Sequence, residues 1–362
     1  MPDLSREKLE PYLSGILGTP VQVLRLSMLG ERISAGAVKE YGYGTPVLVE
    51  YVAGGLHRKA VLETISPGPF GHEHMSDRAQ MLLWDYDAFR RLPRHTRPLD
   101  VGAFLSQGSL LSLGGAEEFF LLTDYVEGNG YIKDLARLQD GGALTELDLA
   151  RADALCDYLV DVHRLQGTDP GLYTRRIREL LGHGECIMGL MDSYPTPHDF
   201  ITADLLTSIE KRCVEWRWRL KGRTHRLRRV HGDFHPYNIL FREGTDFSVL
   251  DRSRGEWGDP ADDIVSLTGN YLFYSLQRCG RLEGAFESLF LRFWGRYLEM
   301  TGDREILEVA APFYAFRCLV MASPVWYPSL SVEVRKKLFT FLAAVLEADS
   351  FDPAGANAYC GA

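Results

Sequence analysis

Long apolar runs, paired cysteines and an excess of positive charge are all missing from this chain of 362 residues. No stretch approaches the roughly 20 apolar residues that a membrane-spanning helix needs, which argues against a membrane protein. The six cysteines are scattered without a Cys-x-x-Cys pair, so we expect reduced thiols and neither a disulfide scaffold nor a zinc site. The formal net charge of −9 argues against a general nucleic-acid coat. Because the first ten residues are polar and acidic, and not basic and then apolar like a secretory signal, we expect a cytoplasmic protein.

What is present is the composition of a globular protein. Apolar residues make up 46% of the chain and charged residues 25%, which excludes a disordered or fibrous protein. The length leaves room for two domains or for one large two-lobed domain.

The N-terminal part has the pattern of β-strands. Residues 21–29, 46–55 and 57–66 are rich in β-branched side chains and are separated by glycine turns. The segment between the first two contains several glycines, and such a backbone can approach a ligand closely. A further strand pair is predicted at 108–114 and 117–128.

Helical spacing dominates the remainder. A helix is predicted over 76–93, where four apolar residues share one face: Met81, Trp84, Ala88 and Leu92. Three later faces repeat the spacing, and they comprise Leu149, Ala152, Cys156, Leu159 and His163, then Phe286, Leu289, Phe293, Trp294 and Tyr297, then Val334, Leu338, Phe341 and Val345. A small β-rich part followed by a larger helical part predicts a two-lobed α+β fold.

The most informative stretch is 229–267. Two short apolar strands flank a turn at Glu243-Gly244 and predict a hairpin, which would bring Asp233 and Asn238 close to Asp251. Two carboxylates and an amide oxygen form a site of hard oxygen ligands that suits Mg²⁺. A carboxylate beside such a metal could also accept a proton from a substrate hydroxyl. Taken singly, each of these residues could equally be a polar residue of a turn.

Together, HGDFHPYN and LDRSRGEWGDPADD resemble the catalytic and metal-binding segments of aminoglycoside phosphotransferases and choline kinases, small-molecule relatives of the protein kinases. In kinases the loop signature runs from Asp to Asn over five positions, as it does here from Asp233 to Asn238. The resemblance implies a protein-kinase-like fold with a small antiparallel N-terminal lobe that binds nucleotide, at 1–127. It implies a larger, mainly helical lobe for catalysis and substrate binding at 128–362.

The resemblance also implies individual roles. Asp233 matches the catalytic base, and His235 lies where protein kinases place a lysine. Asn238 matches a metal ligand and Asp251 the principal metal-binding aspartate. His231 would then structure the loop.

Two further acids, Asp259 and Asp263, match the structural pair of the family's GDPxxD segment. The residues themselves agree for Asp259, because Pro260 follows it and proline suits the first position of a helix. We therefore expect a helix cap at Asp259 and structural roles for both acids.

For the nucleotide, the resemblance implies that the segment FFLLTDYVEG links the two lobes and offers its backbone to adenine. On that match Asp124, Tyr125 and Val126 lie at the edge of the nucleotide. The alternative from the residues alone is an ordinary buried strand that ends in a turn.

The sequence departs from the family at the position of the lysine that holds the α- and β-phosphates. The matching residue is Glu63, and its partner position in the helix is Asp85, so two acids stand where a cation and an acid are expected. Lys59 shares a strand face with Glu63, and Lys39 lies in the glycine-rich segment. Either lysine could supply the missing charge.

Two other features have competing interpretations. His72-Glu73-His74 could bind a metal, but without further ligands nearby a surface loop is favoured. The stretch 211–229 holds nine basic residues, the single acid Glu215 and two tryptophans. It could receive an anionic substrate or RNA, or it could be a solvated helix face.

The sequence thus predicts a phosphotransferase that moves the γ-phosphoryl group of ATP, or of another nucleoside triphosphate, to a hydroxyl of an unidentified small molecule with Mg²⁺. The alternative is a nucleotide-binding pseudokinase that acts as a regulator or scaffold, which Glu63 favours. Nucleotidyl transfer on the same fold is a third possibility. We expect no membrane partner and no nucleic-acid partner, although the basic stretch leaves the latter open.

Overall fold

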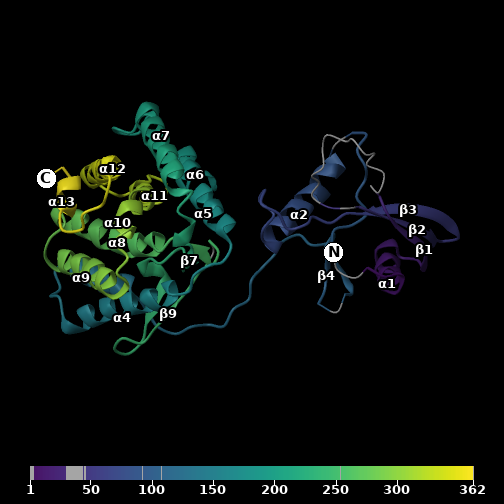
Figure 1. Ribbon diagram of the computed structural model, residues 1–362, viewed down its shortest axis with the longest axis horizontal. Coiled ribbons are helices and arrows are strands. Elements are labelled where there is room, and N and C mark those ends of the chain that lie inside the picture. Colours follow the sequence, from purple (N-terminus) through teal and green to yellow (C-terminus); the bar gives the residue numbers. More distant parts are fainter. Residues whose placement is uncertain are drawn as a thin grey trace. The chain divides into compact units, whose positions relative to one another are not determined.

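The computed structural model describes residues 4–29, 44, 46–91, 93–106, 108–252 and 254–361. The chain divides into two compact units, Met1–Thr123 and Asp124–Ala362, so the division lies a few residues before the predicted one between 127 and 128 (Figure 1). In the described part of the chain, no helix combines the length and the apolar character that a bilayer crossing requires.

The first unit is built on a three-stranded antiparallel sheet in the order β1-β2-β3. Its strands are β1 (Val21–Met28), β2 (Val47–Ala53) and β3 (Leu56–Leu62), which confirms the three strands predicted from the sequence. Every second residue of β2 is buried. These side chains pack against Leu9 and Leu13 of α1 (Arg6–Leu17) and form a small core of their own. Gly54 and Gly55, both with positive φ, make the two-residue turn between β2 and β3.

Two predictions for the rest of this unit need correction. The helix predicted over 76–93 is present as α2 (Met75–Arg91), but the described part of its apolar face is not buried, and Trp84 is 72% exposed. The strand predicted at 117–128 is wrong: β5 (Leu110–Ser112) pairs with β4 (Gly102–Phe104), and 117–128 forms no strand. A β-strand needs a neighbouring strand with which its backbone can form hydrogen bonds. After residue 117, the chain first finds such a partner at β6 (Asn129–Gly130), which pairs with β8.

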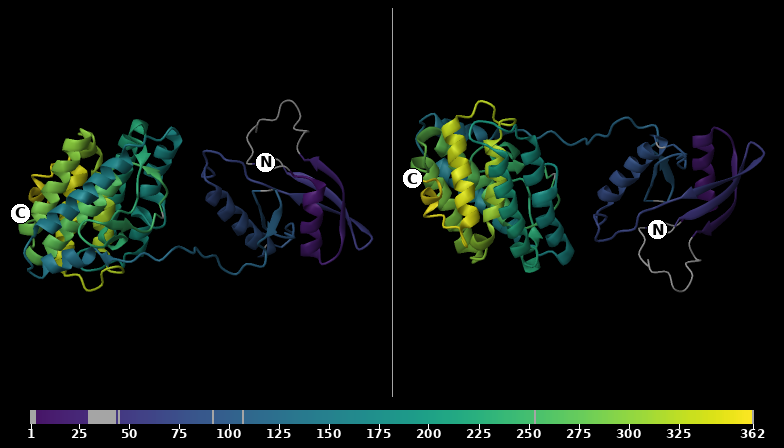
Figure 2. Two further views of the ribbon diagram at one scale, coloured as in Figure 1. Left: turned by 90° about the horizontal axis from the view of Figure 1, so that it is seen from below. Right: turned by 90° about the horizontal axis from the view of Figure 1, so that it is seen from above.

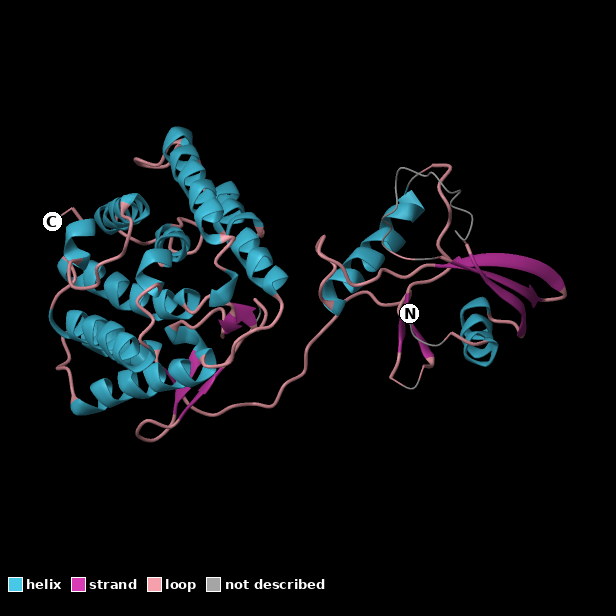
Figure 3. Ribbon diagram, in the orientation of Figure 1, coloured by secondary structure: helices cyan, strands magenta, loops and turns pink. Residues whose placement is uncertain are grey.

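The second unit is mainly helical, as Figure 3 shows. Its helices are α3 (Ile132–Gln139), α4 (Glu146–His163), α5 (Pro170–Gly182), α6 (Ile187–Ser193), α7 (Ala203–Leu220), α8 (Ala261–Cys279), α9 (Gly284–Thr301), α10 (Ile306–Val309), α11 (Ala311–Ala322), α12 (Val332–Glu347) and α13 (Ala356–Tyr359). Nearly all of α8 is buried, and α3, α9, α11 and α12 pack against it. The three apolar faces predicted for the later helices are confirmed in α4, α9 and α12, apart from half-buried Leu149. Figure 2 shows the helices of this unit in two further views.

Short strands and single helical turns surround the segment that the sequence marks as catalytic. β8 (Ile239–Phe241) and β9 (Phe247–Val249) form the predicted hairpin. A second strand pair joins β7 (Arg228–Arg229) to β10 (Trp257–Gly258). Two 3₁₀ turns lie beside these strands, η1 (Thr224–Arg226) and η2 (Pro236–Asn238).

Candidate active site

The loop between β7 and β8 is held in place by the first turn of α8. The carboxylate of Asp263 accepts the amide of His231 at 2.8 Å and the amide of Gly232 at 2.7 Å. Gly232 has φ of +86°, a left-handed conformation that a side chain would strain. The same carboxylate lies 3.0 Å from Nε2 of His163, on α4. The loop conformation therefore depends on a buried acid far along the chain.

Asp233, the predicted base, is almost buried and is surrounded by cationic groups. Its Oδ1 atom lies 2.6 Å from Nη1 of Arg317 and 3.4 Å from Nη1 of Arg254. Its Oδ2 atom lies 3.5 Å from Nε2 of His235. Burial alone would raise the pKa of Asp233, but Arg317, His235 and Arg254 together hold it well below its usual value. The side chain is therefore an ionised acceptor of hydrogen bonds at neutral pH.

The two predicted metal ligands are connected to the residues around Asp233 by hydrogen bonds. Asn238 donates its amide Nδ2 to the Asp233 carbonyl at 3.1 Å, which leaves its Oδ1 atom available. The amide of Leu250 donates to the Asn238 carbonyl at 2.8 Å, so the next residue, Asp251, lies beside the loop. The hairpin thus brings the three predicted residues together.

The donor set fits a divalent cation. Asp251 is exposed, has φ of +54° and forms no hydrogen bond or ion pair within the described residues. Aspartate is among the few residues that adopt this conformation. The unpaired carboxylate of Asp251 and the amide oxygen of Asn238 are hard oxygen donors of the kind that Mg²⁺ prefers. Groups of three or more His, Cys, Asp or Glu that could bind a metal are not found among the described residues.

Asp259 is anchored more firmly than a helix cap requires. The helix α8 begins at Ala261, so Pro260 is its N-cap, one residue later than predicted. The Asp259 carboxylate still accepts the Ala261 amide at 3.0 Å. It also pairs with Arg226 at 2.8 Å and accepts the hydroxyl of Tyr173 at 2.8 Å.

Sequence reasoning missed a chain of buried charges behind the loop. Asp262 accepts two hydrogen bonds: its Oδ2 atom accepts one from Nη2 of Arg176 at 2.6 Å, and its Oδ1 atom accepts one from Nη2 of Arg317 at 3.1 Å. Arg317 in turn reaches Asp233, which lies 84 residues before it in the sequence. The available signal was an arginine inside the apolar run of residues 311–322, because a buried arginine needs acidic or carbonyl partners.

The predicted phosphate-binding groups lie in the first unit. Lys59 is 68% exposed and pairs with Glu50 of the neighbouring strand at 2.8 Å. A cavity of about 640 Å³ in this unit is lined by Lys59, Glu63 and Asp85, among other residues. Lys39 and most of the glycine-rich segment lie outside the described residues.

The predicted adenine-binding residues lie at the start of the second unit. Asp124 and Tyr125 are exposed, Tyr125 by 89%, and Val126 is partly buried. None of the three belongs to a strand. The alternative of a buried strand is therefore wrong.

Four arginines of the basic stretch 211–229 pair with acids that come from later in the chain: Arg212, Arg219, Arg223 and Arg226. Arg212 pairs with Glu347 at 2.6 Å, and Arg223 pairs with Glu305 at 2.8 Å. These contacts favour the helix-face interpretation over a nucleic-acid surface. In the other ambiguous segment, His72 is buried with Nε2 at 3.2 Å from Sδ of Met81, so it is not a surface loop residue.

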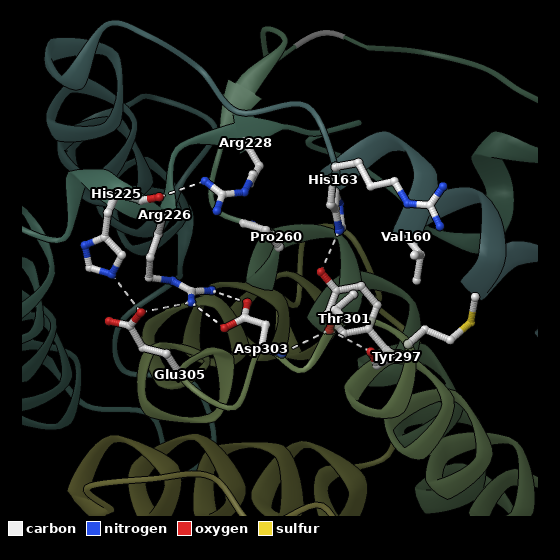
Figure 4. Close-up of a pocket in the computed structure, with 12 residues that line it drawn as sticks. Val160, His163, His225, Arg226, Arg228, Pro260, Tyr297, Thr301, Asp303 and Glu305 are labelled. Atoms are coloured by element: carbon white, nitrogen blue, oxygen red, sulfur yellow. Dashed lines mark hydrogen bonds and ion pairs between the residues drawn. The ribbon is translucent and has the colours of Figure 1, made fainter.

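A polar cavity of about 400 Å³ lies elsewhere in the second unit (Figure 4). His163 and Tyr297 point toward each other across it, with 2.8 Å between Nδ1 and the hydroxyl. Arg226 and Asp303 also pair, at 2.8 Å. Asp233 does not line this cavity, and many of its lining groups bind one another.

Comparison with known proteins decides the family. A sequence model described as the phosphotransferase enzyme family matches residues 85–300, more than half of the chain. The chain belongs to this family. Membership confirms the resemblance and the α+β, kinase-like fold with a small antiparallel sheet and a mainly helical larger unit. The matched range of this phosphotransferase includes the loop with Asp233 and the segment with Asp251.

Solved structures similar to this phosphotransferase are kinases of small molecules. An ethanolamine kinase from Plasmodium vivax is 10% identical, with a TM-score of 0.34 over 93% of this chain and 80% of that chain. An amicoumacin kinase in complex with AMP-PNP and Ca²⁺ is 14% identical, with a TM-score of 0.41 over 92% and 91%. A choline kinase from Streptococcus pneumoniae is 12% identical, with a TM-score of 0.34 over 94% and 98%. No curated protein sequence matches the chain.

Proposed function

We propose that this chain transfers the γ-phosphoryl group of ATP, or of another nucleoside triphosphate, to a hydroxyl group of a small molecule in the cytoplasm. The observation that carries the proposal is the convergence of Asp233, Asn238 and Asp251 within the range that matches the phosphotransferase family. Such a site combines a proton acceptor with two oxygen ligands for a metal.

Each residue has a role in this reaction. Asp233 accepts a hydrogen bond from the acceptor hydroxyl and receives its proton as the new O–P bond forms. The bond between the γ-phosphorus and the oxygen that bridges it to the β-phosphate breaks, and the nucleoside diphosphate leaves with that oxygen. Asn238 and Asp251 hold Mg²⁺, which neutralises charge on the phosphates when it is bound. Catalysis then consists mainly of positioning the two substrates and of stabilising charge.

Further residues are proposed for the contacts with the nucleotide. Lys59 and Lys39 are the proposed partners of the phosphates, because the usual lysine position is Glu63. Asp124, Tyr125 and Val126 are proposed to lie at the edge of the nucleotide base.

The first experiment is a turnover screen with Mg²⁺ and either ATP or GTP. The acceptors tested are choline and ethanolamine, after the choline kinase and the ethanolamine kinase described above, and gentamicin, which is bound in a further similar structure. Sugars and nucleosides complete the panel. We expect one acceptor to raise ADP or GDP formation well above the rate with water.

A second experiment tests the metal through Asp251→Ala. Removing this ligand should abolish transfer and should remove the Mg²⁺ dependence of ATP affinity. Asp246→Ala is the matched control, because Asp246 is an exposed acid of the same hairpin that pairs with Arg242. ATP is titrated against each protein with Mg²⁺ and with a chelator. If the parent binds ATP with the same affinity in Mg²⁺ and in chelator, and no acceptor is phosphorylated, the result favours a pseudokinase over the proposed enzyme.

A further inference from the structure

Arg317 occupies a special place beside the candidate base. It comes from α11, which packs against α8, and its side chain is only 8% exposed. One planar guanidinium group spans two carboxylates, because Nη1 donates to Oδ1 of Asp233 at 2.6 Å and Nη2 to Oδ1 of Asp262 at 3.1 Å. The same Nη2 lies 3.4 Å from the carbonyl of Gly232.

This guanidinium group is itself fixed from several sides. Asp262 is held on its other oxygen by Arg176 at 2.6 Å, so the acid cannot swing away from Arg317 without losing a buried ion pair. The guanidinium group of Arg317 also lies over the ring of Phe316, 4.8 Å from its centre. Because the guanidinium group is planar and is held by these contacts, it has little rotational freedom. Its hydrogen bond to Asp233 therefore restricts the orientation of that carboxylate.

The two oxygens of Asp233 therefore differ. Oδ1 is occupied by Arg317 and is approached by Arg254 at 3.4 Å. Among the described residues no arginine forms an ion pair with Oδ2, and Nε2 of His235 lies 3.5 Å from it. An acceptor hydroxyl that meets this carboxylate has Oδ2 available to it.

We propose that Arg317 is the positioning residue of this phosphotransferase: it clamps Oδ1 of Asp233 and thereby presents Oδ2 to the acceptor hydroxyl. This inference rests on the proposed function of Asp233. Arg317 itself touches neither substrate. A carboxylate that rotated freely would spend much of its time with neither oxygen in line with the hydroxyl, and small misplacements of a reacting group cost large factors in rate.

The test compares Arg317→Met and Arg317→Lys with Arg335→Met. Arg335 is a matched control, because it is equally buried on the neighbouring helix α12 and bonds to the carbonyls of Ala322 and Tyr327. The reaction measured is ADP formation from ATP and Mg²⁺ with water as acceptor, and with choline, ethanolamine and gentamicin in parallel.

We expect Arg317→Met to lower kcat by about 10²-fold at an unchanged KM for ATP. Arg317→Lys keeps the charge but cannot span both carboxylates, so it should recover only part of the loss. Arg317→Ala should regain turnover when guanidinium ion is added at millimolar concentration. Arg335→Met should lose stability without such a change in kcat. Parental kcat in Arg317→Met or Arg317→Lys, or no gain by Arg317→Ala with guanidinium ion, would overturn the clamp. An equal loss of kcat in Arg335→Met, at a temperature where both proteins are folded, would overturn it as well.

A double-mutant cycle separates this inference from the function on which it rests. The unfolding equilibria of parent, Arg317→Met, Asp233→Asn and the double variant give the coupling between the two side chains. We expect about a tenfold effect on the equilibrium constant. Coupling without any ADP formation by the parent would refute the proposed function and, with it, the presentation of Oδ2, and would leave the Arg317–Asp233 pair as a structural contact. Turnover by the parent without coupling would refute the clamp and keep the function.

Discussion

At the scale of single residues, Asp233 combines near-complete burial with an ionised carboxylate. Asp233→Asn keeps the shape of the side chain but removes the proton acceptor and the charge that pairs with Arg317. We expect kcat to fall by roughly 10²-fold or more, with ATP affinity nearly unchanged. Steady-state turnover and ATP titration measure the two quantities separately.

The control for this change is Asp246→Asn, because Asp246 is an exposed acid in the turn of the following β8–β9 hairpin, where it pairs with Arg242. It should behave like the parent in both measurements. Full turnover by Asp233→Asn would remove Asp233 from the reaction and leave the base unassigned.

Of the two lysines proposed to bind the phosphates, Lys59 lies in the part of the chain that the structure describes. Its exposed ammonium group pairs with Glu50 at 2.8 Å and lines the same cavity as Glu63. Lys59→Ala should weaken ATP binding more than adenosine binding, because only ATP carries the phosphates that a cation attracts. Titration of both ligands measures the difference.

Arg58→Ala is the matched control, since neighbouring residues of a strand point to opposite faces. Lys39→Ala tests the other candidate in the same way. If both lysine variants bind ATP like the parent, another group holds the phosphates.

The sequence revealed the part of the site that is contiguous along the chain. Asp233 and Asn238 are five positions apart, and a short hairpin brings Asp251 to them, so spacing alone predicted their meeting. Arg317 was beyond such reasoning, because its contact with Asp233 depends on how α11 packs against α8. Asp262 was overlooked for the same reason, although it stands beside Asp263 in the motif.

At the scale of elements, α4 begins with a complete capping box. The hydroxyl of Thr145 accepts the Asp148 amide at 3.3 Å, and the Asp148 carboxylate accepts the Thr145 amide at 2.8 Å and pairs with Arg137 at 2.5 Å. Thr145→Ala should lower the free energy of unfolding by about 1 kcal/mol. Urea unfolding at neutral pH checks this value, and an unchanged unfolding midpoint would show that the cap contributes nothing.

The pH dependence of Asp148→Asn follows from the same contacts. Burial raises the pKa of Asp148, but Arg137 and Thr145 outweigh it and lower the pKa below its usual value. A lowered pKa in the folded protein stabilises it above the pKa of the unfolded chain, about 3.9, and this contribution is lost as pH falls through the folded value. The difference in unfolding free energy between parent and Asp148→Asn should therefore be largest near pH 7 and shrink below about pH 4. A difference that stays constant with pH would contradict the ion pair.

Helices with one buried apolar face could be predicted from the sequence. Strands were harder to predict, because a strand also needs a neighbouring strand with which to pair. The spacing of α4, α9 and α12 matches what the core buries, because one stripe of each helix faces α8 or its neighbours. The segment 117–128 has the composition of a strand, yet its backbone meets no partner before Asn129. Composition measures the tendency to form a strand and says nothing about the pairing that makes one.

At the scale of the whole molecule, the change from strands to helices along the sequence corresponds to two units with separate cores. The core of the first unit comprises residues between Leu9 and Ala53, and the core of the second begins at Tyr131. The fold and the type of chemistry follow from the catalytic segment. The acceptor does not, because the same fold serves many substrates and the choice depends on side chains around the loop.

Two separate cores predict two separable unfolding transitions. Leu13→Ala removes a buried side chain from the first core, and Leu289→Ala does the same in the second. Each should destabilise its own unit by about 2–5 kcal/mol, the usual cost of such a cavity, and should leave the other unit nearly unchanged. Differential scanning calorimetry of the parent and of both variants measures the two midpoints. Because the same Leu→Ala change is made in each core, the two variants can be compared directly. A single transition whose midpoint temperature falls equally in both variants would show that the two units unfold together.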